Sequence, residues 1–283
     1  NGVDNEIQNP GQYFKFRTKS RDAISTVVDR ANNDVVRKIM HKERFIPIIS
    51  EYSLSSISAS QKEDYETMFP GSVYTGGTGS FNVANASVIG DEVVTDNGYL
   101  YTINQVIEPL ETIYAEMNKE NSDYTQFAKM YDRFVVYQYD EDATRDYGNG
   151  DSLFVHSHNT LPPIACEWTN SYKSSTPDYA QMNYLTSVSY AVLAPDNKSI
   201  NQFFQKYWSA SYSSLEEVNF VPLYHFMNAH AITCDGNMVG AYALGRYIAN
   251  NDLWDDHQLA MPTDVKVCSN GILGGMKDNV ITP

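Results

Sequence analysis

The chain has 283 residues, of which 42% are hydrophobic, so it is long enough for two domains or one large domain and too apolar for wholesale disorder. Its 20 basic and 35 acidic residues give a net charge of −15, and a surface this acidic repels phosphate backbones and argues against a nucleic-acid partner. The 21 tyrosines, beside only 19% charged residues, favour neutral polar and stacking contacts of the kind that exported proteins make.

Cysteine and membrane signals are sparse. Cys166, Cys234 and Cys268 form no CxxC pair, so we expect buried thiols, and one disulfide with one free thiol remains the alternative. No stretch reaches the about 18 apolar residues of a transmembrane helix. Asn1 is preceded by neither Met nor an apolar leader, so we expect a removed signal or a trimmed chain, and membrane contact only through a lipid anchor outside it.

The expected elements of the first half change from helix to strand. Apolar residues recur near helical spacing over residues 23–49, with a break expected at residues 32–34. The pattern changes to short strands over residues 81–94 and to a stronger strand over residues 99–103.

Helix is expected again over residues 110–135, and the polar run NKENSD at residues 118–123 is the expected junction between two units. An acidic loop is expected at residues 140–151, followed by a long polar loop at residues 156–184.

The C-terminal part is expected to alternate strand and helix. Its pattern predicts a strand at residues 188–193 and helices at residues 200–208 and 215–226. Two short strands, at residues 265–268 and 272–273, are expected to close the chain.

An internal repeat connects the two halves. Residues 95–109 (TDNGYLYTINQVIEP) and residues 268–283 (CSNGILGGMKDNVITP) both contain Asn-Gly, a hydrophobic pair, a spacer and Val-Ile-x-Pro. The Asn-Gly dipeptides favour turns that start a strand, and the Val-Ile pairs are expected to form a closing strand that the proline ends. The turn residues are Asn97, Gly98, Asn270 and Gly271.

This repeated pattern resembles the C-terminal signature of fasciclin-like domains. Residues 190–197 (YAVLAPDN) resemble the first motif of that family, and residues 223–226 (LYHF) resemble its central Tyr-His motif. The three motifs occur in the family's order. In the first half only the C-terminal motif is clear, and Met40 stands where the tyrosine of the Tyr-His pair would fall.

The resemblance implies an α+β protein with two tandem fasciclin-like copies, each with short strands in a compact sheet wedge and helices packed on one side. Copy 1 would span residues 1–117, with its front part missing or diverged. Copy 2 would span residues 118–283, with insertions at about residues 140–184.

A strand-to-helix motif has a structural explanation of its own. Pro195 removes a ladder donor and ends the strand, and Asp196 or Asn197 can cap the following helix. That helix is expected to turn four apolar residues inward: Ile200, Phe203, Phe204 and Tyr207.

Three residues are candidates for binding. Tyr224 and His225 fit either interior packing, with the imidazole hydrogen-bonded inside the fold, or the adhesion surface that the fasciclin resemblance implies. Trp168 is a candidate for stacking on a sugar ring.

We expect no metal and no cofactor. His156 and His158 lie on one side of an extended segment, and His230, Asp235 or His257 could complete a site, but the spacing matches no known ligand set. The acidic run from residue 140 lacks the ligand pattern of a calcium loop and is expected to be solvated.

The sequence therefore predicts a non-catalytic exported protein of the cell surface or outer membrane that contacts other surface proteins or glycans. An accessory lipoprotein of an outer-membrane nutrient-uptake complex is one such role. Motifs of common enzyme classes, such as GxSxG, HExxH and the P-loop, are absent from the sequence. The alternative is a hydrolase that acts on a glycan, with its site at residues 140–184.

Overall fold

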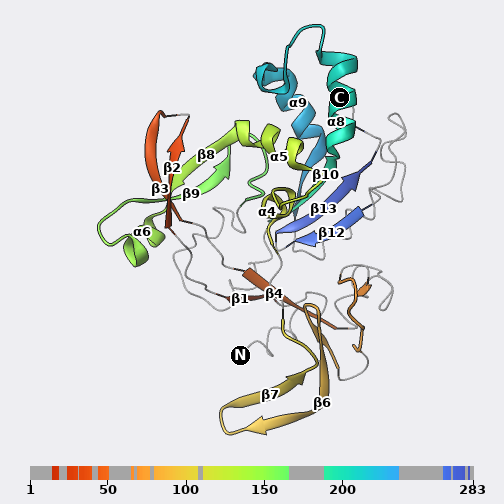
Figure 1. The fold of residues 1–283 in the computed structure, drawn as a ribbon. Helices are drawn as coiled ribbons and strands as arrows, with labels where there is room; N and C mark the ends of the chain where they lie inside the picture. The colour runs from red at the N-terminus through yellow and green to blue at the C-terminus, as the bar shows by residue number, and fades with distance from the viewer. Residues whose placement is uncertain are drawn as a thin grey trace.

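The computed structural model combines mixed sheets with several helices, which confirms the predicted α+β class (Figure 1). The structure describes residues 15–18, 24–30, 32–39, 44–50, 65–66, 69–76, 80–107, 111–165, 188–235, 264–268, 270–277 and 280. Three sheets are formed by these residues.

The best-packed sheet has four strands in the order β11-β10-β13-β12. β10 pairs in parallel with β13, whereas β11 and β12 are antiparallel to their neighbours. All residues of β13 are buried, as expected for an inner strand covered on both faces. These strands confirm the predictions for this part of the chain, and their bounds are β10 Val188–Pro195, β11 Ala231–Asp235, β12 Asp264–Cys268 and β13 Gly271–Met276.

Short helices pack against this sheet and enclose the main hydrophobic core (Figure 1). They are α4 (Ile113–Met117), α5 (Thr125–Tyr131), η1 (Asp132–Phe134), α8 (Asn197–Phe203), η4 (Phe204–Trp208), η5 (Leu215–Glu217) and α9 (Phe220–His230). Helix is therefore confirmed over most of residues 110–135, with the expected interruption between α4 and α5.

The predicted strand-to-helix motif is confirmed. β10 ends at Pro195, and the Asp196 side chain accepts a hydrogen bond from the Ser199 backbone N–H at 2.7 Å, which caps α8. Ile200 and Phe204 are buried, but Tyr207 is 52% exposed, so its predicted inward orientation is wrong. A π-helical segment at η4 shifts the helical register, which explains why an α-helical period misplaces this residue.

The second sheet has the order β2-β3-β9-β8 and corrects three predictions. The expected helix over residues 23–49 is wrong, because its β-branched residues form strands. The expected loop at residues 140–151 contains helix α6, which Asp140 caps through Ala143 N–H at 2.8 Å. The expected loop after residue 156 begins inside strand β9. The bounds are β2 Ile24–Asp29, β3 Asp34–Ile39, β8 Val135–Tyr139, α6 Glu141–Tyr147 and β9 Leu153–His158.

The third sheet has the order β1-β4-β5-β6-β7 and ends in a hairpin that projects from the rest of the chain (Figure 1). β6 continues through Gly90, with a register shift between Ile89 and Val93, instead of breaking there as predicted. Val106 and Ile107 belong to no strand, so the predicted closing strand is wrong. The bounds are β1 Lys15–Thr18, β4 Arg44–Ile49, β5 Asn82–Val83, β6 Ala86–Thr95 and β7 Gly98–Ile103.

Contacts cross the predicted domain boundary between residues 117 and 118. β3 pairs in parallel with β9 through Arg37 and Lys38, and Ile113 of α4 lies in the main core with residues of the second half. The division into residues 1–117 and 118–283 stays a prediction, as do its two fasciclin-like copies.

The two Asn-Gly dipeptides both start a strand, as predicted, but their surroundings differ. Asn97 and Gly98 lie in the exposed hairpin turn, and a Cβ at Gly98 would meet no atom within 4 Å. Asn270 is 3% exposed, and Gly271 has φ +148° with its hypothetical Cβ 1.9 Å from the Tyr190 carbonyl oxygen. Only the second dipeptide is therefore part of a packed core.

Matched glycine substitutions measure this difference. Gly271→Ala should destabilise the protein by at least about 3 kcal/mol, because it combines an unfavourable φ with overlap against the Tyr190 backbone. Gly98→Ala should change stability by no more than about 1 kcal/mol. Urea denaturation of both variants checks the prediction, and equal losses would contradict the assigned environments.

The buried histidine at the end of α9 makes stability depend on pH. His230 is fully buried beside the Phe226 carbonyl oxygen, 2.7 Å from Nδ1, and burial lowers its pKa from 6.5 to about 4. The unfolded chain therefore binds more protons between pH 6.5 and pH 4, so stability falls as the pH is lowered through this window.

His230→Gln should remove this contribution, which amounts to up to about 3 kcal/mol at the acid end of the window. The measurement is the free energy of unfolding of both proteins from pH 6.5 down to pH 4. The variant should lose less stability than the parent, and an unchanged slope would show that His230 is not held neutral in the fold.

Candidate functional site

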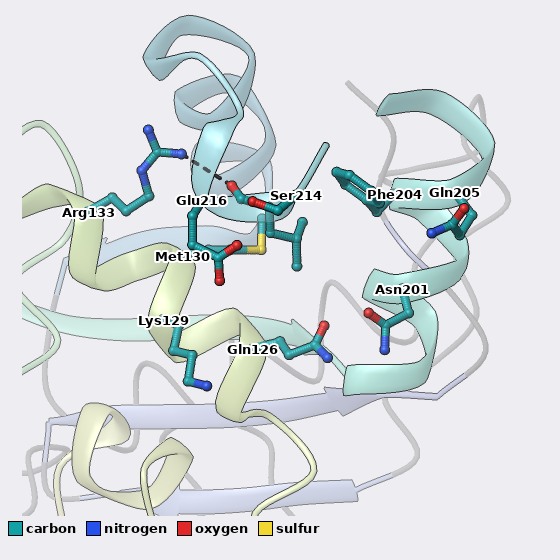
Figure 2. Close-up of a pocket in the computed structure, with 10 residues that line it drawn as sticks. Gln126, Lys129, Met130, Arg133, Asn201, Phe204, Gln205, Ser214 and Glu216 are labelled. Atoms are coloured by element: carbon teal, nitrogen blue, oxygen red, sulfur yellow. Dashed lines mark hydrogen bonds between the residues drawn. The ribbon is translucent and has the colours of Figure 1, made fainter. Parts of the chain in front are cut away.

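A pocket of about 340 Å³ lies between α5, the α8–η4 helix and the η5 turn (Figure 2). Its lining combines carboxamides, charged groups and apolar side chains. The carboxamides are Gln126, Asn201 and Gln205, the charged groups are Lys129, Arg133 and Glu216, and the apolar side chains include Met130, Phe204 and Leu215.

The carboxamides of Gln126 and Asn201 face each other across the pocket (Figure 2). Gln126 lies near the start of α5, where its backbone N–H donates to Asn197 Oδ1 at 2.8 Å and joins the first turns of α5 and α8. Its side-chain Oε1 is buried and has no hydrogen-bond partner among the described residues. A buried acceptor of this kind is available to a polar ligand.

Arg133 holds the opposite wall of the pocket in place. Its Nη1 donates to the carbonyl oxygens of Val218, at 2.6 Å, and Leu215, at 3.3 Å. Hydrogen bonds from its own backbone N–H and from Ser214 hold the pKa of the Glu216 carboxyl below its usual value, and the charges of Lys129 and Arg133 act in the same direction. Glu216 is therefore a carboxylate at neutral pH.

A second candidate is the β6–β7 hairpin, which exposes large apolar side chains on both faces. Val93 pairs with Leu100, and Val94 pairs with Tyr99 on the opposite face, because neighbouring strand residues alternate. We call this the hairpin surface, with Ile89 as a further member. Exposure is 50% at Val93, 70% at Val94, 59% at Tyr99, 59% at Leu100 and 45% at Ile89.

The binding residues expected from the sequence lie elsewhere. Tyr224 is half-buried and stacks on Phe220, with centroids 6.4 Å apart and an interplanar angle of 9°. His225 is exposed, so its expected interior hydrogen bonding is wrong. Neither residue lines the pocket. Trp168 lies outside the described residues.

His156 and His158 are brought together with Asp132, a residue that the sequence did not single out as a partner. Burial lowers the pKa of His156 to about 4 and that of His158 well below its usual value, so both imidazoles are neutral. Of the expected partners, His230 lies in the core on α9, and the side chains of Asp235 and His257 lie outside the described part. Asp132, His156 and His158 are the described residues that could hold a metal ion.

No family model, curated protein or solved structure matches this chain. The fasciclin resemblance therefore stays a prediction. Among the described residues, no helix has the length and apolar character needed to cross a membrane.

Proposed function

We propose that the protein is a non-catalytic surface protein that binds another protein through the hairpin surface. The observation that supports this most is the row of apolar residues on both faces of a projecting two-stranded hairpin. A two-stranded hairpin is marginally stable by itself in water, and clustered exposed apolar residues mark interaction sites. Burial against a partner stabilises both the hairpin and the complex.

The charge of the hairpin defines the chemistry of its partner. Asp91, Glu92 and Asp96 lie exposed among the apolar residues, and residues 80–107 contain no lysine or arginine. The proposed partner therefore presents an apolar groove with basic residues at its rim, since complementary charges speed and orient association. Full burial of one such valine or leucine contributes about 1.5–3 kcal/mol.

Export and a place at the cell surface or outer membrane, with an accessory lipoprotein of a nutrient-uptake complex as one form, belong to the same proposal. They are supported by the fasciclin-like motifs and by the tyrosine-rich, weakly charged composition. The hydrolase alternative has less support. Asp151 is engaged by Arg37, and Glu216 is the only carboxylate among the residues that line the pocket, whereas glycosidases use two facing carboxylates.

Site-specific photo-crosslinking tests the protein contact. A photoreactive residue at Tyr99 should give defined adducts with native surface proteins of the source cell, competed by excess unmodified protein. Tyr207 is the matched control, because it is an equally exposed tyrosine, 52% against 59%, on a helix far from the hairpin in the sequence. Leu100→Asp should reduce the Tyr99 adducts about tenfold or more. Equal labelling at both tyrosines, or none at Tyr99, would contradict the proposal.

Glycan contact at the pocket is a second candidate, favoured by its facing carboxamides beside an apolar wall. Carboxamides donate to and accept from sugar hydroxyls without the desolvation cost of charges. On a glycan array, Asn201→Ala should weaken binding about fivefold or more. Gln202→Ala is the matched control, because it removes an exposed carboxamide from the same helix outside the pocket.

Turnover separates binding from hydrolysis in the same experiment. The bound glycan should be recovered intact. Release of a product that is lost in Asp151→Ala or His156→Ala would instead support the hydrolase alternative.

A further inference from the structure

Two histidines of β9 point to the same side of the second sheet. Residues 156 and 158 are two apart on a strand, so their side chains share one face, and their ring centroids are 4.9 Å apart. Antiparallel pairing sets Val135 and Tyr137 of β8 opposite them. This sheet position fixes both imidazoles independently of any loop.

Asp132 brings a carboxylate to the same place. It begins η1, the turn that leads from α5 into β8, and one potential ligand atom from each of Asp132, His156 and His158 lies within 4.8 Å of the others. Ligands of one Zn²⁺ ion at about 2.0–2.1 Å stand about 3.3 Å apart in a tetrahedron. Side-chain rotations that move these atoms by about 1 Å would reach that geometry.

His158 has unmet hydrogen-bonding capacity. Its side chain is 5% exposed, and neither Nδ1 nor Nε2 has a hydrogen-bond partner among the described residues. A buried polar atom without a partner is costly, and such atoms in folded proteins are usually satisfied by a ligand, ion or water. Coordination of a metal ion by one ring nitrogen would remove much of this cost at His158.

Neighbouring tyrosines hold the ligands in place. The Tyr114 hydroxyl donates to Asp132 Oδ1 at 2.6 Å, which fixes the carboxylate and leaves Oδ2 available. The Tyr131 ring meets His158 edge-on, with centroids 4.6 Å apart and an interplanar angle of 86°. Tyr114 packs in the same way on His156, at 4.8 Å and 84°. Such outer contacts are typical of metal sites, where they orient the ligands.

We propose that Asp132, His156 and His158 bind a divalent transition-metal ion of the Zn²⁺ class. Two neutral imidazoles and one carboxylate suit Zn²⁺, Co²⁺ and Fe²⁺ better than Ca²⁺ or Mg²⁺, which prefer oxygen ligands. Three protein ligands leave a position for water or an exogenous group. Asp132 is exposed while both histidines are buried, so the carboxylate side is the route by which the ion enters.

The ion would join two parts of the fold. Asp132 continues from α5, which packs in the main core, whereas His156 and His158 belong to the second sheet. Lys38 of β3 lies close enough to Asp132 and His156 to act on both electrostatically. Its positive charge opposes a cation, so its removal should tighten metal binding.

Zn²⁺ titration of the metal-stripped protein tests this site. The wild type should bind one equivalent, its Tm should rise by about 5 °C or more at saturating Zn²⁺, and Co²⁺ should give visible d–d absorption bands. His158→Ala should abolish the bands and weaken Zn²⁺ binding about a hundredfold. Lys38→Gln should bind Zn²⁺ more tightly than the wild type.

Two further variants keep the test decisive. His225→Ala removes an exposed imidazole from α9 and should leave Zn²⁺ binding unchanged. Asp132→Asn keeps an acceptor for Tyr114 at an exposed position, so it should fold even where His158→Ala does not, and should weaken Zn²⁺ binding at least about tenfold. The proposal is overturned by a wild type that binds no Zn²⁺, or by equal affinities of the wild type and Asp132→Asn.

Discussion

The packed half of the molecule depends on the buried side chain of Asn270. Its Oδ1 accepts from the Ile113 backbone N–H at 2.9 Å, and its Nδ2 donates to the Ile164 carbonyl oxygen at 2.6 Å. Its backbone carbonyl oxygen accepts from Tyr190 N–H at 2.9 Å. One carboxamide thus joins the start of α4, the turn after β9 and the edge where β10 meets β13, and each of these groups would be costly to bury alone.

The candidate sites follow from this junction. With α4 fixed against β13, α5 lies across the core and its first turn meets the start of α8 at Asn197, which creates the pocket between the two helices. The same helix continues into η1 and places Asp132 beside β9. The pocket and the histidine cluster therefore lie on opposite ends of one short helical segment, whereas the hairpin surface is independent of it.

Local signals predicted the elements whose reasons are local. Pro195 and Asp196 ended a strand and capped a helix because each acts on its own backbone neighbours. The segment at residues 23–49 failed because its apolar residues satisfy a helical spacing by coincidence, while their β-branched side chains favour the strand pairings that tertiary partners supply. Asp140 was interpreted as a loop residue although its capping of α6 has the same chemistry as Asp196.

The sequence alone determined the α+β class, the order of strands and helices in the C-terminal part, and the shared face of His156 and His158, since strand alternation is a property of the local backbone. Only the tertiary structure decided that Asp132, at a distance of 24 residues from His156, is their neighbour. It also decided that Asn270 is buried while Asn97, in the same dipeptide, is exposed. Burial and long-range contacts depend on how elements pack, and identical local sequence carries no record of its surroundings.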